Sequence, residues 1–410
     1  MTSGRLVIGA ALALLAGAGC NSVDPTTQIQ YDAYKGDAFP NRRAKIVIPA
    51  GGMAVVTDSR SDTVSFVDLT SGKKMGSYPV GLDPVTIDGP HHVAVDPVKG
   101  AVFVALSYPA LAGATGPHAS HGASILPGYV QKLALDDMRP LGQVRIDANP
   151  GDVVLSEDKK RLVVSHFDLQ RALKNPGNID AQRSTLALID PDQVLPSGSP
   201  DPTLIPLCIA AHGVTLSRPD GAIAYAACYG EDALALADLT HPKAPVKRIP
   251  VGASPGIGNP NYGPYAAVMS PDGKTIAVSN TASKDVRFFD VASETFDLTK
   301  TIKTQGAPYF VAWTADSAKI YIPTQAPDAL HFVDVTQNNL EISFRDMSGV
   351  CEKPHAAELS GLKQLFLVCE GDQTTPGDVV MLDPASLTTM SSTKVGIYPD
   401  AFVRVLGGAK

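Results

Sequence analysis

Short apolar runs that alternate with turn residues follow one another along most of the chain after residue 42. In the clearest example, the runs Tyr265–Met269 and Thr275–Asn280 flank the turn Ser270-Pro271-Asp272-Gly273. The proline of this turn presets φ and the glycine tolerates a positive φ, so the segment predicts a β-hairpin. A third apolar run ends at Asp290. The pattern is typical of consecutive β-strands and not of helices.

The same unit recurs along the chain with two independent landmarks. The residue that begins the first strand recurs at intervals of 44 to 61 residues, at Pro90, Pro150, Ala211, Pro264, Pro308, Pro354 and Pro399. The aspartate that ends the third strand recurs at Asp68, Asp136, Asp190, Asp238, Asp290, Asp334 and Asp383. Each landmark occurs seven times, which indicates seven units. A four-stranded unit repeated in this way predicts an all-β fold, a seven-bladed β-propeller.

The ends of the chain indicate how the ring closes. The last start position, Pro399, is followed by a single strand, residues 401–406, and we expect this strand to complete the N-terminal blade. Residues 45–48 are an alternative inner strand for that blade, and the sequence leaves the choice open.

The repeat resembles that of the YVTN-type β-propeller proteins of bacterial surfaces. The residues that carry the resemblance are the hairpin Ser270–Lys274, the strand Ile276–Asn280 and the strand end Phe288-Phe289-Asp290. The resemblance covers residues 42–406 and implies an exported seven-bladed propeller. It implies no particular reaction, because such repeats serve different functions in different proteins.

The N-terminus resembles a bacterial lipoprotein signal. Arg5 precedes the uncharged run Leu6–Gly19, which is too short to cross a bilayer and ends in small residues before Cys20. We expect a signal peptide at residues 1–19, a lipidated Cys20 with a flexible tether at residues 20–41, and the propeller at residues 42–410. An ordinary secretory signal cleaved near Gly19 is the alternative. Either signal implies export, and lipidation implies a location in the bacterial cell envelope, facing the periplasm or the cell surface.

Charge narrows the range of partners. The chain has 34 Lys+Arg, 41 Asp+Glu and a net charge of −7, which gives no basic surface for nucleic acid. We expect a monomer that contacts the membrane only through its lipid anchor and binds a protein or a small molecule.

Four cysteines remain once Cys20 is set aside. They occupy equivalent positions in two blades, so we expect the disulfides Cys208–Cys228 and Cys351–Cys369. The alternative is a pair of metal sites, each formed by two cysteines and the nearby histidine: Cys208, His212 and Cys228, and Cys351, His355 and Cys369.

Candidate ligand-binding residues follow from the ring symmetry. The residue after each start position is expected at the channel mouth, and His166 ends a neighbouring strand. The predicted binding set is His91, His166, His212, Tyr265, Tyr309, His355 and Asp400. Because imidazole is a common ligand of Cu and Zn, the candidate metal ligands are His91, His166, His212 and His355, with His118 and His121 from a long loop.

The chain lacks a P-loop and a dinucleotide fingerprint, so no established nucleotide-binding motif accompanies these residues. The first interpretation is therefore a non-catalytic binding scaffold with no catalytic residues. The alternative is an enzyme, either metal-dependent (Cu, Zn or Fe) or lactonase-like, that uses the histidine cluster.

Overall fold

The computed structural model describes residues 44–82, 87–107, 123–337, 339–361 and 364–407. The predicted signal peptide, Cys20, the tether and the loop with His118 and His121 lie outside these residues. Within the described ranges, no helix is both long and apolar enough to cross a membrane.

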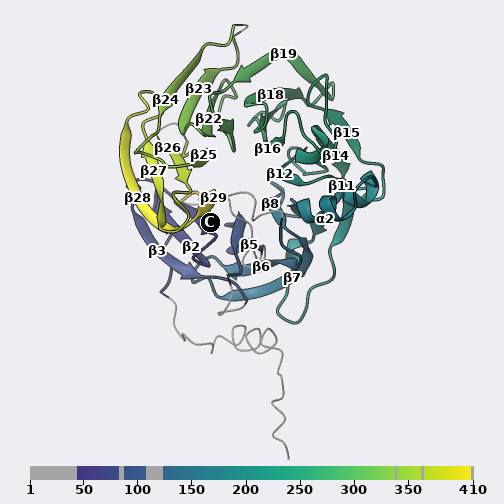
Figure 1. Cartoon of the computed structure of the whole chain (residues 1–410). Coiled ribbons are helices and arrows are strands. Elements are labelled where there is room, and N and C mark those ends of the chain that lie inside the picture. The colour runs from purple at the N-terminus through teal and green to yellow at the C-terminus, as the bar shows by residue number, and fades with distance from the viewer. Residues whose placement is uncertain (1–43, 83–86, 108–122, 338, 362–363, 408–410) are drawn as a thin grey trace, which may run out of the picture.

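Seven β-sheets surround a central axis and confirm the predicted propeller (Figure 1). From the axis outward, blade 1 consists of β29 (Pro399–Val405), β1 (Met53–Asp58), β2 (Thr63–Asp68) and β3 (Lys74–Pro79). Blade 2 consists of β4 (Pro90–Asp96), β5 (Ala101–Leu106), β6 (Pro127–Ala134) and β7 (Pro140–Ala148). Blade 3 consists of β8 (Pro150–Leu155), β9 (Leu162–His166), β10 (Ser184–Ile189) and β11 (Thr203–Cys208).

Blade 4 consists of β12 (Ala211–Leu216), β13 (Ile223–Cys228), β14 (Ala233–Asp238) and β15 (Lys247–Pro250), and blade 5 of β16 (Pro264–Met269), β17 (Thr275–Asn280), β18 (Asp285–Asp290) and β19 (Thr295–Lys303). Blade 6 consists of the divided inner strand β20 (Ala307–Pro308) and β21 (Ala312–Trp313), then β22 (Lys319–Gln325), β23 (Ala329–Asp334) and β24 (Ile342–Asp346). Blade 7 consists of β25 (Pro354–Leu359), β26 (Leu365–Cys369), β27 (Pro376–Leu382) and β28 (Thr389–Ile397). The short helices are α2 (Leu169–Lys174), α3 (Ile179–Gln182), η2 (Pro191–Gln193) and η3 (Tyr229–Glu231).

The C-terminal strand closes the ring, as one of the two sequence alternatives predicted. β29 pairs antiparallel with β1, with Met53 opposite Val405 at one end and Asp58 opposite Pro399 at the other. The two ends of the propeller sequence therefore share the first blade (Figure 1). The competing segment lies beside the ring. Ile46 and Ile48 pack against the core between blades 1 and 2, and the Ile46 N–H donates to the Asp136 carbonyl at 2.7 Å.

Burial between blades holds the ring together. Apolar side chains from each pair of neighbouring blades form one cluster, for example Val55 and Phe66 of blade 1 with Val93 and Val102 of blade 2. The ring closes in the same way, because Phe366 of blade 7 packs with Val56 of blade 1. No single sheet could bury both of its faces, so the repeat is stable only as a complete ring.

The aspartate after each third strand has a local structural role. Asp290 Oδ1 accepts hydrogen bonds from the N–H and the hydroxyl of Ser293, and Asp383 Oδ1 accepts the same pair from Ser386. These hydrogen bonds lower the pKa of both carboxyl groups. At these two positions the aspartate therefore caps the turn that follows the strand.

Both predicted disulfides are present. Cys208, the last residue of β11 in blade 3, bonds to Cys228 at the end of β13 in blade 4. Cys351, which precedes β25, bonds to Cys369 at the end of β26 in blade 7. The alternative of cysteine–histidine metal sites is wrong, because a sulfur in a disulfide is not a thiolate ligand.

Removing one disulfide should destabilise the propeller. The two bonds join residues 20 and 18 positions apart, and closing loops of this length stabilises a protein by about 3 kcal/mol each. For the variant Cys351→Ser/Cys369→Ser we expect that loss in the free energy of unfolding, measured in urea. As a control, a reductant should destabilise the wild type more than the variant, which retains one bond. A loss below 1 kcal/mol would contradict this role.

Candidate active site

The inner strands share a local irregularity at the position that the sequence singles out. Their pairing with the second strand shifts between Pro90 and Val93, Pro150 and Val153, Ala211 and Val214, Pro264 and Ala266, and Pro354 and Ala356. A bulge bends the strand and changes the direction of the residues within it, and bulges are frequent near active sites. The skipped residues in four of these five strands include a histidine or a tyrosine.

The bulge in β4 brings two consecutive histidines together. In a regular strand His91 and His92 would point to opposite faces. Their ring centroids instead lie 4.5 Å apart, and both lie near the ring of His212 from blade 4, at 5.5 and 5.6 Å. One ligand nitrogen from each of the three rings lies within 4.8 Å of the other two. All three side chains are buried.

Hydroxyl groups from neighbouring blades hold the main chain of the site. The hydroxyl of Thr57 donates to the His91 carbonyl, and that of Ser165 donates to the His212 carbonyl. The hydroxyl of Ser279 makes the corresponding bond to the Tyr309 carbonyl at 2.6 Å. Each bond runs from one blade to the next, so the histidine positions depend on the packing between blades.

Asp400 links histidines from the two blades beside its own. Its Oδ2 accepts a hydrogen bond from His91 Nδ1 of blade 2, and its Oδ1 lies 2.9 Å from His355 Nδ1 of blade 7. His355 Nδ1 also contacts the Asp400 carbonyl at 2.9 Å. The three side chains are at most 1% exposed.

The pKa values in this group separate the two histidines. Burial lowers the pKa of His91 to about 4, even beside Asp400. Burial would also lower the pKa of His355, but the charges of Asp400 and Glu370 outweigh it and raise that pKa to about 9. Burial opposes the ionised form of Asp400, yet the two histidines hold its pKa well below the ordinary value. At neutral pH the group therefore contains a neutral His91 beside an ion pair of Asp400 and His355.

His92 has its own carboxylate. Its Nδ1 lies 2.7 Å from Asp152 Oδ1, while Asp152 Oδ2 accepts a hydrogen bond from the Val214 N–H at 3.0 Å. His92 Nε2 is buried and has no hydrogen-bond partner within the described ranges. A histidine that donates from Nδ1 to a carboxylate presents Nε2 as a ligand, the usual arrangement of histidines that bind metal.

Aromatic side chains surround the third histidine. The ring of His212 stacks on Tyr265, with centroids 3.8 Å apart and planes 22° from parallel. Phe167 meets the same imidazole edge to face at 5.2 Å, and Tyr309 meets Tyr265 at 5.2 Å. These contacts restrict the orientation of the imidazole.

The structure brings together most, but not all, of the predicted residues. His91, His212, His355, Asp400, Tyr265 and Tyr309 form one connected group, linked by the contacts described above and by the 5.1 Å approach of Tyr309 to His355. They are buried, although the sequence led us to expect them at the channel mouth. The candidates His118 and His121 lie outside the described residues.

His166 lies apart from this group. It ends a second strand, and its Nδ1 contacts the Thr185 carbonyl of the third strand at 2.7 Å. Asn280 occupies the same position in blade 5 and likewise bonds to the third strand, at Asp285. This position therefore faces away from the axis. Within the described ranges, the group of side chains that could hold an ion is His91, His92 and His212, which includes neither His166 nor His355.

The binding set predicted from the sequence omits two residues that contact this group, His92 and Asp152. Both lie inside bulges, where the alternation of a regular strand fails. The signals were available in the consecutive histidines His91-His92 and in an aspartate two residues after the start position Pro150.

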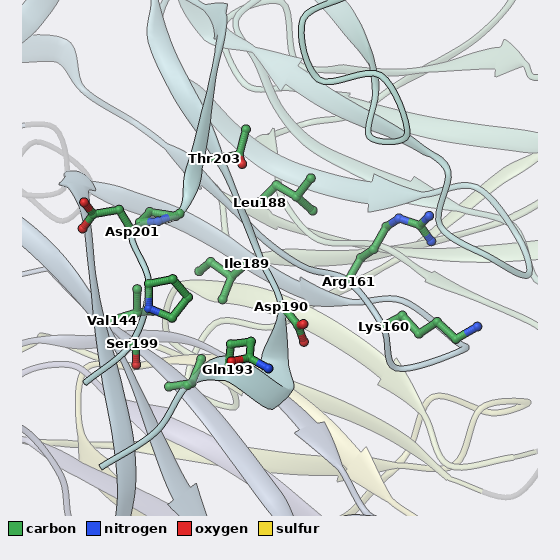
Figure 2. Close-up of a pocket in the computed structure, with 13 residues that line it drawn as sticks. Val144, Lys160, Arg161, Leu188, Ile189, Asp190, Gln193, Ser199, Asp201 and Thr203 are labelled. Atoms are coloured by element: carbon green, nitrogen blue, oxygen red, sulfur yellow. The ribbon is translucent and has the colours of Figure 1, made fainter. Parts of the chain in front are cut away.

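A cavity of about 600 Å³ occupies the centre of the ring. His92, Asp152 and Asp400 line it together with residues of the inner strands. A smaller cavity of about 330 Å³ lies beside blade 3, where Leu188, Asp190 and Arg161 contribute to its wall (Figure 2). No histidine lines it. The central cavity is therefore the one that meets the histidine cluster.

No protein-family profile and no curated protein matches this chain. Solved structures do match it. The periplasmic gluconolactonase PpgL of Pseudomonas aeruginosa has a TM-score of 0.62 and 16% identity over 87% of this chain and 99% of its own. A putative 6-phosphogluconolactonase of Bacteroides fragilis has a TM-score of 0.60 and 15% identity, covering 87% and 98%. The dihydro-heme d1 dehydrogenase NirN has a TM-score of 0.55 and 17% identity, covering 88% and 77%.

These similarities correct one expectation from the sequence. The three structures carry the names of enzymes, two of them lactonases, so the interpretation as a non-catalytic scaffold is wrong and the enzyme alternative is favoured. At these identities the comparison shows the seven-bladed fold alone, and the resemblance to YVTN-type repeats stays a prediction.

Loss of the Asp152 carboxylate should destabilise the ring. In Asp152→Ala, the buried Val214 N–H and His92 Nδ1 lose their acceptor, and each unsatisfied group costs about 1–3 kcal/mol. We expect a loss of about 2–4 kcal/mol in the free energy of unfolding, measured in urea. Asp201→Ala, at an exposed aspartate, is the control and should change stability by less than about 0.5 kcal/mol. Equal stability of the two variants would contradict this role.

Proposed function

We propose that this protein is a metal-dependent hydrolase that opens a lactone or a similar ester, with the ion held by His91, His92 and His212. The observation that carries the proposal is the approach of three buried imidazoles within 4.8 Å. Three protein ligands with a further open position are typical of catalytic zinc sites. A tetrahedral ion with bonds of about 2.0–2.1 Å needs the nitrogens closer, about 3.3 Å apart, which small rotations of the rings could supply.

The surrounding residues support this assignment. Asp400 and Asp152 orient His91 and His92 from behind, the role that carboxylates have beside metal-binding histidines. The low pKa of His91 keeps its imidazole neutral, which a metal ligand requires. The His91–Asp400 pair is buried with His355, so the carboxylate charge is balanced before any ion binds.

A bound zinc ion would supply an activated water and polarise the ester carbonyl. Hydrolysis of a lactone breaks the bond between the acyl carbon and the ring oxygen, with the oxygen of water going to the acyl carbon and a proton to the ring oxygen, and His91, His92 and His212 would hold the ion beside that bond. The chain itself would hold the ion through the three histidines. It would also enclose the reacting group in the central cavity, which His92, Asp152 and Asp400 line. Similarity to two lactonases in fold supports the choice of reaction.

Metal analysis and hydrolysis test this proposal together. We expect one zinc ion per chain by elemental mass spectrometry, and hydrolysis of δ-gluconolactone or a related lactone that a chelator abolishes and zinc restores. His91→Ala and His212→Ala should each weaken zinc binding at least tenfold, because each removes one of three ligands.

Two variants serve as matched controls. His166→Asn, which places the residue of blade 5 at the same position, and His241→Ala, at an exposed histidine, should retain the metal. A wild-type protein without stoichiometric metal, whose lactone hydrolysis survives His91→Ala, would contradict the proposal. Stoichiometric copper without any hydrolysis would contradict the hydrolase assignment, since imidazole also suits copper.

We also propose that the protein is exported and anchored to a membrane of the bacterial envelope through lipid on Cys20. The signal-like sequence before Cys20 supports this, and the two disulfides are consistent with an oxidising compartment.

The anchor can be tested by fractionation. Cys20→Ala removes the only thiol in the lipoprotein-like motif, so we expect the protein to leave the membrane fraction, whereas Ser22→Ala should stay there. Mass spectrometry of the N-terminal peptide would detect the lipid directly. If the Cys20→Ala protein still sediments with membranes after a salt wash, another feature holds it there.

A further inference from the structure

The central cavity connects two chemically different ends of the ring. Its inner end is lined by His92, Asp152 and Asp400, and its other end by Lys159, Arg218 and Arg404. Leu406, which also lines it, is 55% exposed, so the cavity reaches the surface on that side. Asp400 and Arg404 lie on the same strand, β29, four residues apart, which corresponds to about 13 Å in an extended chain.

Apolar residues line the cavity between these ends. Val154, Val268, Ala356 and Phe402 come from the inner strands of four different blades and are partly exposed to the cavity. Such a wall favours a hydrocarbon segment over a strongly hydrated one. A small polar lactone would leave this stretch without a complementary group.

The outer end carries more positive than negative charge. Arg404 pairs with Glu358 at 2.6 Å, and Arg218 pairs with Glu157. Lys159 makes no ion pair within the described ranges and is partly exposed. Three positive and two negative side chains therefore leave one net positive charge at this rim, although the net charge of the whole protein is −7. A local cation at the mouth of a cavity attracts and orients anions.

We infer that the substrate is an elongated anionic ester or lactone that enters the central cavity from the rim of Lys159, Arg218 and Arg404. Its carbonyl lies at the histidine cluster, an apolar segment crosses the wall of Val154, Val268, Ala356 and Phe402, and a carboxylate or phosphate contacts the rim. The inference rests on the proposed function for the identity of the reacting group. The shape and charge of the ligand follow from the cavity alone, so they can be tested without hydrolysis.

Binding of decanedioate tests the inference by calorimetry on the full protein. Its two carboxylates are separated by a hydrocarbon chain comparable in length to the ~13 Å from Asp400 to Arg404 along β29. The inner carboxylate would stand where a substrate carbonyl lies. We expect Lys159→Ala and Arg404→Gln each to weaken binding about fivefold to tenfold, whereas Lys160→Ala, outside this cavity, should leave it within twofold. Decyl phosphate serves as the second probe, and the tighter of the two shows which anion the rim prefers.

A blocking variant provides independent information. Thr215 lines the cavity on β12, and Thr215→Phe should reduce decanedioate binding more than tenfold while the zinc content stays at the wild-type value. No measurable binding of either probe, or binding that is insensitive to both Lys159→Ala and Thr215→Phe, would overturn the inference. Binding without lactone hydrolysis would support the cavity's ligand class and contradict only the proposed reaction.

Discussion

The buried carboxylate of Asp400 is the constraint that joins the fold to the site. It lies on β29, the strand that closes the ring, and contacts His91 of blade 2 and His355 of blade 7. An isolated charge buried this deeply would be strongly destabilising, so the carboxylate requires both neighbours in place. Because those neighbours come from opposite sides of its blade, Asp400 contacts both of them only when the ring is closed. The charge distribution of the site therefore depends on β29, the last strand of the chain.

The symmetry of the ring explains how a repetitive scaffold creates one asymmetric site. Bulges recur near the start of the inner strands, and hydroxyls of Thr57, Ser165 and Ser279 bind the main chain of the next blade. This framework is the same whichever side chain occupies the bulge. Substitution at one position per blade can therefore change the chemistry of the centre while the packing between blades is preserved, as expected for folds that carry many functions.

Sequence periodicity was sufficient for the architecture, because proline and aspartate landmarks report the start of the first strand and the turn after the third. The disulfides followed from the same alignment. The site was only partly predictable. His92 was left out of the predicted set because a regular strand would turn it away from His91, and only the bulge in β4 brings the two rings together. His166 was misplaced because residues that end a second strand bond to the third, as Asn280 does. The burial of the cluster also depends on side chains from several blades, which no single repeat reveals.

The sharing of one carboxylate between distant parts of the chain has a consequence for how the protein matures. A protein chain is synthesised from its N-terminus onward, and Asp400 lies 309 residues after its partner His91 in the sequence. His91 therefore emerges from the ribosome long before the carboxylate that accepts its hydrogen bond. An ion captured by the incomplete chain would meet a different ligand environment from that of the closed ring. The environment that the proposed ion would meet is therefore a property of the finished molecule, in which β29 has paired with β1.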